Sequence, residues 1–122
     1  MMAALRSLPL VALCSLLDAA QVAAQPACKP IVTVKEESFS RPFNLRRVWT
    51  ASINVDASRC TTTSGLFSIG FIRLAENAPD LTFTEPFIWR LGQKRVVVEF
   101  WADEAVQNYW IADIAACPCR SD

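Results

Sequence analysis

The chain of 122 residues has no histidine, only three glycines and no net charge. Without an imidazole it has no histidine general base and no histidine metal ligand. Three isolated glycines, Gly65, Gly70 and Gly92, do not form the glycine-rich loop that holds a phosphate group. The balanced charge provides no general attraction for nucleic acid or anionic lipid. These absences argue against a nucleic-acid partner and against most enzyme mechanisms.

Carboxylate pairs are the remaining source of acid and base catalysis. The pairs that the sequence offers lie where strands end or turns begin, and solvated acids are ordinary there: Glu36 with Glu37, Glu76 with Asp80, and Asp103 with Glu104. Glu85 differs because it interrupts an apolar alternation, and we expect a kink at Pro86 to turn it to solvent. We therefore predict that the protein is not an enzyme and has no catalytic residue, cofactor or metal.

The N-terminus is typical of a secretory signal peptide. A basic residue, Arg6, precedes an apolar run over residues 8–17, and the small side chains of Val22, Ala23 and Ala24 suit cleavage before Gln25. The run is about half of the roughly 20 residues that a helix needs to cross a bilayer. We expect residues 1–24 to be removed and residues 25–122 to form one domain, secreted or periplasmic, with no membrane anchor after cleavage.

Four cysteines follow the predicted cleavage site: Cys28, Cys60, Cys117 and Cys119. An even number in a short exported chain indicates a disulfide framework. A bridge between Cys117 and Cys119 would close across Pro118 alone and would be strained, so each should reach back, one to Cys28 and one to Cys60. Structural zinc sites use cysteine pairs spaced by two to four residues, which the chain lacks.

Alternation of apolar and polar residues, the mark of a half-buried strand, covers most of the rest of the chain. In the clearest case, residues 47–56, Trp49, Ala51, Ile53 and Val55 share one face. We expect residues 31–35 to form an edge strand. Three further segments alternate, namely 66–74 with Phe67, Ile69 and Phe71 inward, 81–91 with Leu81, Phe83, Phe87, Trp89 and Leu91 inward, and 95–101 with Val96, Val98 and Phe100 inward.

These segments predict an all-β fold. Pro86 makes 81–91 an edge strand or two strands that meet at a kink, and Gly70 indicates a bulge or a close backbone approach. Residues 102–114 fit a helical turn over Asp103–Gln107 followed by a strand over Tyr109–Ala115, which we favour over a single closing strand. We expect a small antiparallel β-sandwich of immunoglobulin-like or fibronectin-like architecture, stabilised by disulfides.

Large aromatic side chains are numerous, and most of them should pack in the core. If Phe100 points inward, the next residue, Trp101, points outward, and a hairpin would place it beside Tyr109. An exposed aromatic pair is a platform for a protein or carbohydrate partner. We therefore take Trp101 and Tyr109 as the candidate binding surface.

Together these features favour a non-enzymatic binding or structural module. The alternative is a small protein inhibitor of an exported hydrolase, which would use the polar loop over residues 59–65 as its rigid contact segment.

Overall fold

The computed structural model describes residues 26–121. Within that range all regular structure is β-strand, and no helix is long and apolar enough to cross a membrane. The strands are β1 (Ala27–Cys28), β2 (Ile31–Phe39), β3 (Arg46–Asp56), β4 (Ser64–Ala75), β5 (Ala78–Arg90), β6 (Gly92–Trp101), β7 (Glu104–Ala112) and β8 (Cys117–Pro118). The expected all-β fold is confirmed, whereas the predicted signal peptide over residues 1–24 lies outside the described residues.

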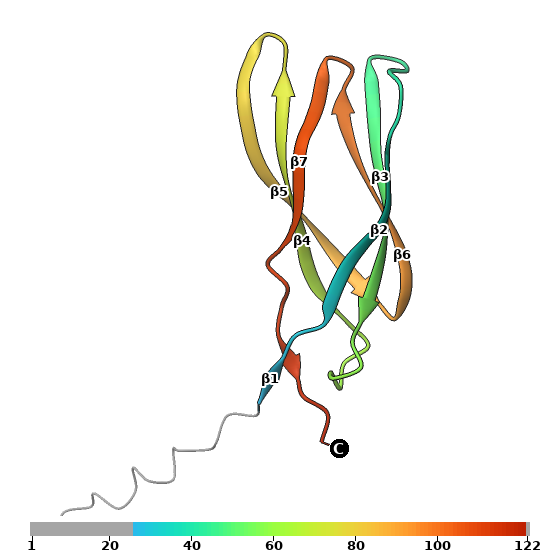
Figure 1. The fold of residues 1–122 in the computed structure, drawn as a ribbon, viewed down its shortest axis with the longest axis vertical. Helices are drawn as coiled ribbons and strands as arrows, with labels where there is room; N and C mark the ends of the chain where they lie inside the picture. Colours follow the sequence, from blue (N-terminus) through green and yellow to red (C-terminus); the bar gives the residue numbers. More distant parts are fainter. Residues whose placement is uncertain (1–25, 122) are drawn as a thin grey trace, which may run out of the picture.

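The six long strands form two antiparallel sheets that pack face to face (Figure 1). One sheet has the order β2-β3-β6 and the other the order β5-β4-β7, while β1 and β8 pair as a short ribbon at the end near the C-terminus. The chain passes between the two sheets after β3, after β5 and after β6. Each long sheet therefore contains strands from distant parts of the sequence.

The core lies between the two sheets and is built from the inward faces that the alternation predicts. Trp49 of β3 meets Phe71 of β4 edge to face with ring centroids 4.9 Å apart, and Phe71 meets Phe100 of β6 at 5.7 Å. Every residue predicted to face inward from 47–56, 66–74 and 95–101 is buried. Gly70 has the predicted close approach, because a Cβ there would overlap the indole of Trp110.

Strand β5 corrects one expectation. It is continuous through Pro86 and lies at the edge of its sheet, where a residue without an N–H is tolerated. Glu85 keeps its place in the alternation, opposite the buried Ile69, and stays half-buried instead of turning out to solvent. The open edge allows this carboxylate to remain hydrated. Leu81 and Leu91, predicted to face inward, are exposed.

Strand β7 corrects the expectation of a helical turn after residue 102. No helical turn forms over Asp103–Gln107, because a tight turn at Ala102 and Asp103 leads directly into β7 at Glu104. The pairing of β7 with β4 shifts by one residue between Ile72 and Arg73, so that Gln107 is an extra residue. This bulge lets Val106 and Tyr109, three positions apart, both pack on the core. The bulge thus reproduces the spacing that suggested a helix.

Two disulfides close the end of the sandwich that carries β1 and β8. They join Cys28 to Cys119 and Cys60 to Cys117, with Cα separations of 5.1 and 5.6 Å. The expectation that each C-terminal cysteine reaches back is confirmed, and the structure decides the partners. Two intramolecular disulfides are compatible with an oxidising compartment.

Candidate functional site

The end of the sandwich opposite the disulfides gathers three chain reversals: the β2–β3 loop, the β4–β5 turn and the β6–β7 turn (Figure 1). Three large apolar residues there are exposed: Phe43 by 77%, Leu45 by 77% and Trp101 by 59%. The backbone N–H of Ala102 donates to the carbonyl of Leu45 at 2.9 Å, which ties the β6–β7 turn to the β2–β3 loop. We call Phe43, Leu45 and Trp101 the apolar tip.

The β2–β3 loop holds its apolar residues in a tight, unusual turn. Phe43 and Arg46 exchange backbone hydrogen bonds of 2.8 and 3.0 Å, and the two residues between them, Asn44 and Leu45, have φ of 51° and 65°. Asparagine tolerates this left-handed region, but leucine does not, and such a conformation costs about 1–2 kcal/mol. Because Leu45 is also exposed, core packing does not account for its presence. Backbone strain of this kind concentrates at functional sites.

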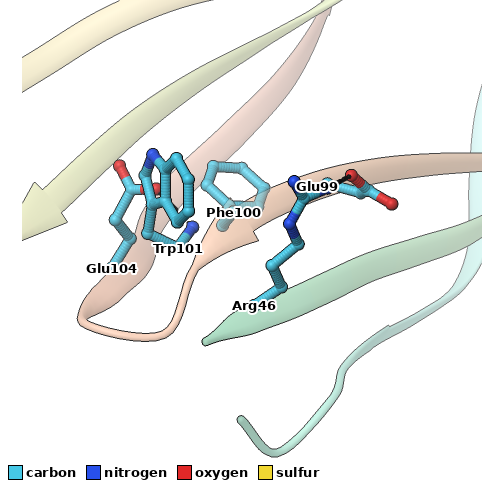
Figure 2. A pocket seen from close by; sticks show the side chains of 5 residues that line it. All are labelled: Arg46, Glu99, Phe100, Trp101 and Glu104. Atoms are coloured by element: carbon cyan, nitrogen blue, oxygen red, sulfur yellow. Dashed lines mark hydrogen bonds and ion pairs between the residues drawn. The ribbon is translucent and has the colours of Figure 1, made fainter. Parts of the chain in front are cut away.

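Trp101 lines a shallow pocket of about 210 Å³ with Arg46, Glu99, Phe100 and Glu104 (Figure 2). The guanidinium of Arg46 forms an ion pair with Glu99 at 2.7 Å and lies 5.6 Å from the centre of the Trp101 ring. Phe100 points the opposite way into the core, as predicted. The predicted exposure of Trp101 is therefore present, with a cation beside the ring.

The support beneath Trp101 is Glu104, which is only 6% exposed. One carboxylate oxygen accepts the backbone N–H of Trp101 at 2.5 Å, and the other pairs with Arg73 of β4 at 3.0 Å. The carbonyl of Glu104 accepts a hydrogen bond from Arg47 of β3 at 3.1 Å. Side chains from β3 and β4 therefore hold the β6–β7 turn, and the backbone that presents Trp101 is preorganised.

Tyr109 is not part of this tip. Its ring is half-buried between the sheets, 5.2 Å from Trp49, whereas Trp101 points outward beside Arg46. The expected platform fails because Trp101 and Tyr109 belong to different sheets, β6 to one and β7 to the other. The structure does not bring the two aromatic rings together.

Tyr109 instead borders a groove of about 400 Å³ between the edge strands β2 and β7. We call this the β2–β7 groove; it is lined by Glu37, Ser38, Phe39, Trp49, Val106, Gln107, Asn108 and Tyr109. The indole N–H of Trp49 donates to Glu37 at 3.0 Å. Burial, and secondarily the negative charge of Glu37, raise the pKa of Tyr109 above its ordinary value of 10.0.

We predict that Tyr109, the single tyrosine of the chain, titrates above its ordinary pKa in the folded protein. Glu37→Gln should lower the pKa part of the way, since burial is the larger cause, whereas Glu36→Gln should leave it unchanged. The protonated phenol stabilises the fold fully below the pKa of the unfolded chain, and this contribution is lost as pH rises through the folded pKa. Ultraviolet absorbance titration measures both effects, and an equal shift in the two variants would contradict the assignment.

The opposite end of the molecule holds the loop that suggested an inhibitor. Cys60 is bridged to Cys117. The backbone N–H of Thr61 donates to the carbonyl of Pro118 at 3.0 Å, and the backbone N–H of Arg120 donates to the carbonyl of Arg59 at 2.9 Å. The loop also borders a hollow of about 350 Å³. Residues 61–63 are exposed on this rigid frame, while Ser64 and Gly65 already belong to β4.

The roles of four residues of these sites were not anticipated from the sequence. Phe43 and Leu45 have a detectable signal, because Asn44 between two alternating segments is typical of a hairpin turn with positive φ. The expectation of a solvated acid is wrong for Glu104, whose burial depends on a strand distant in sequence. For Glu37 no local pattern predicts the contact with Trp49.

Among residues 26–121, no three cysteine or acidic side chains gather as metal ligands. No protein-family model matches the chain, and no match occurs among the curated proteins or the solved structures.

Proposed function

We propose that the protein is an exported, non-enzymatic binding module of immunoglobulin-like architecture that contacts another protein through its apolar tip. The observation that carries this proposal is the pair Phe43 and Leu45, each 77% exposed, on a turn that places a leucine at a φ of 65°. A fold gains nothing from exposing two apolar side chains on a strained turn. Burial against a partner would give them a role.

Trp101 and Arg46 complete the surface. Tryptophan and arginine are enriched among the residues that dominate binding energy at protein interfaces. Arg46 lies beside the Trp101 ring and forms an exposed ion pair with Glu99, so its guanidinium can exchange Glu99 for an acidic group on a partner. The tip therefore suits a protein that offers an apolar hollow with a carboxylate at its rim.

The architecture supports this role. The two sheets, β2-β3-β6 and β5-β4-β7, with crossings after β3, β5 and β6, resemble an immunoglobulin-like sandwich in layout. Such sandwiches place loops together at their ends, where binding residues are held on a rigid frame. Here the tip lies at the end away from the disulfides, and export to the periplasm or the exterior would supply the oxidising conditions that those bridges need.

The test is photo-crosslinking in the producing cell with two serine-substituted proteins. The first carries Phe43→Ser, Leu45→Ser and Trp101→Ser, and the matched control carries Leu81→Ser and Ile88→Ser, which replace exposed apolar residues of β5. We expect the unchanged chain and the control to capture the same partner protein, and the tip variant to capture none of it. Equal capture by all three chains would refute the proposal, and binding of the tip to a glycan array would assign it to carbohydrate.

A second experiment separates binding from folding at Leu45. Leu45→Gly should abolish partner capture while raising the free energy of unfolding by about 0.5–1 kcal/mol, because glycine removes the left-handed penalty at some entropic cost. Urea denaturation followed by tryptophan fluorescence measures the stability. A destabilised Leu45→Gly protein would show that the leucine serves the fold.

An inhibitor of an exported hydrolase is the second candidate, because the loop around Thr61 and Thr62 is exposed and held by the Cys60–Cys117 bridge. Rigid, preorganised loops lower the entropy cost of docking into a cleft. In that case reduction of the Cys60–Cys117 bridge should abolish inhibition of the target, and the triple tip variant should inhibit as strongly as the unchanged chain.

A further inference from the structure

In the part of the chain that the structure describes, four strands of the two long sheets have a free edge: β2, β6, β5 and β7. Soluble proteins protect such edges with charges, prolines or bulges, because unpaired backbone groups recruit other strands. Three of the edges are protected in this way: β2 by a bulge at Lys35 with Glu36 and Glu37, β5 by Pro79 and Pro86, and β6 by Lys94, Arg95 and Glu99.

Strand β7 is the exception. From Ala105 to Ala112 it has no charged residue and no proline, and its bulge at Gln107 lies before the last five residues. Those residues, 108–112, pair with β4 on one side, and their other edge has no strand partner among the described residues. An uncharged, regular edge of this length is a site for strand addition.

The β2–β7 groove lies along this edge and is lined by both polar and apolar side chains. Trp49 forms its base, and the half-buried rings of Phe39 and Tyr109 and the side chain of Val106 border it. Because β2 and β7 do not pair with each other, an added strand would extend the β5-β4-β7 sheet and cover this groove. Alternate residues of the added strand would then point inward, toward Trp49 and Tyr109.

The charge of the groove indicates what the added strand carries. Glu37 faces inward opposite Ala51 and accepts the indole N–H of Trp49 at one oxygen, Oε2. The residues that line the groove include no lysine or arginine, so its one charged group is an acid without a cation. Glu37 is exposed at the edge of β2, where its carboxylate can attract a lysine or arginine from a partner.

We propose that the β2–β7 groove binds an extended segment of a partner protein, which pairs with β7 as an added strand and places a lysine or arginine between inward-facing apolar residues, against Glu37. A second copy of this chain fits less well, because it would bring its own acidic β2 edge, with Glu36 and Glu37, to the same groove. The site is separate from the apolar tip and does not depend on it.

The test uses a synthetic peptide, Val-Thr-Val-Thr-Lys-Thr-Val-Thr-Val, in which the valines and the lysine share one face. We expect amide chemical-shift changes and slowed hydrogen exchange along Ala105–Ala112, with no change along the protected β5 edge. A peptide with glutamate in place of lysine should bind the unchanged chain about tenfold more weakly. The original peptide should bind the Glu37→Gln protein about tenfold more weakly as well, and each change is a loss of about 1.4 kcal/mol in binding free energy.

The controls make the result specific. Glu36 pairs with Ser52, so its side chain lies on the face of β2 opposite to that of Glu37. The Glu36→Gln protein should therefore bind the peptide as the unchanged chain does. Trp101→Ser should also bind normally, which distinguishes failure of this proposal from failure at the tip. The proposal is overturned if β7 does not respond to the peptide, if a peptide N-methylated at alternate residues binds equally, or if the free protein is already a dimer with β7 protected.

Discussion

Replacing Cys28 and Cys119 together by serine should lower the free energy of unfolding by about 4–5 kcal/mol, from the chain-entropy model for a closed loop. The bridge spans a sequence separation of 91 residues, so it removes much of the freedom of the unfolded chain. The net stability of a domain is about 5–15 kcal/mol, and the loss is therefore a large part of it. Urea denaturation followed by tryptophan fluorescence measures the change.

The Cys60–Cys117 bridge supplies the comparison, because its separation of 57 residues is shorter. The same model expects the paired Cys60→Ser and Cys117→Ser protein to lose slightly less, by about 0.4 kcal/mol. The protein with all four replacements should be largely unfolded. A loss below about 1 kcal/mol for the longer bridge would mean that the packed sheets alone define the fold.

Glu104→Ala should lower the free energy of unfolding by about 3–5 kcal/mol, because it leaves the partly buried guanidinium of Arg73 without its carboxylate. The substitution also removes the acceptor for the backbone N–H of Trp101. Chemical denaturation measures the loss. We expect the fluorescence of Trp101 to report a more mobile tip in the same variant.

Glu99→Ala is the matched control, since Glu99 lines the same pocket and forms an ion pair with Arg46. Both side chains of that pair are more than half exposed, and exposed ion pairs contribute about 0–1 kcal/mol. Similar losses for Glu99→Ala and Glu104→Ala would show that burial does not distinguish the two pairs. A double-mutant cycle of Glu104 with Arg73 then isolates their coupling.

The errors of sequence interpretation have specific physical causes. The helical spacing at Val106 and Tyr109 arises from a single extra residue in β7, and a bulge depends on the strand opposite. Of the two alternatives at Pro86, the edge strand is confirmed and the kink is wrong, because an edge strand tolerates a residue without an N–H. For the bulge the deciding fact is which strand lies opposite, and no local pattern contains that information.

The amino-acid sequence by itself determined the all-β class, the inward faces of three strands, the outward direction of Trp101 and the return of both C-terminal cysteines to earlier ones. These follow from the two-residue period of a strand and from chain geometry, which are local. Tertiary structure alone decided the cysteine partners, the separation of Trp101 from Tyr109, the burial of Glu104 and the open β7 edge. These depend on the sheet to which each strand is added, and that is set by packing across the whole core.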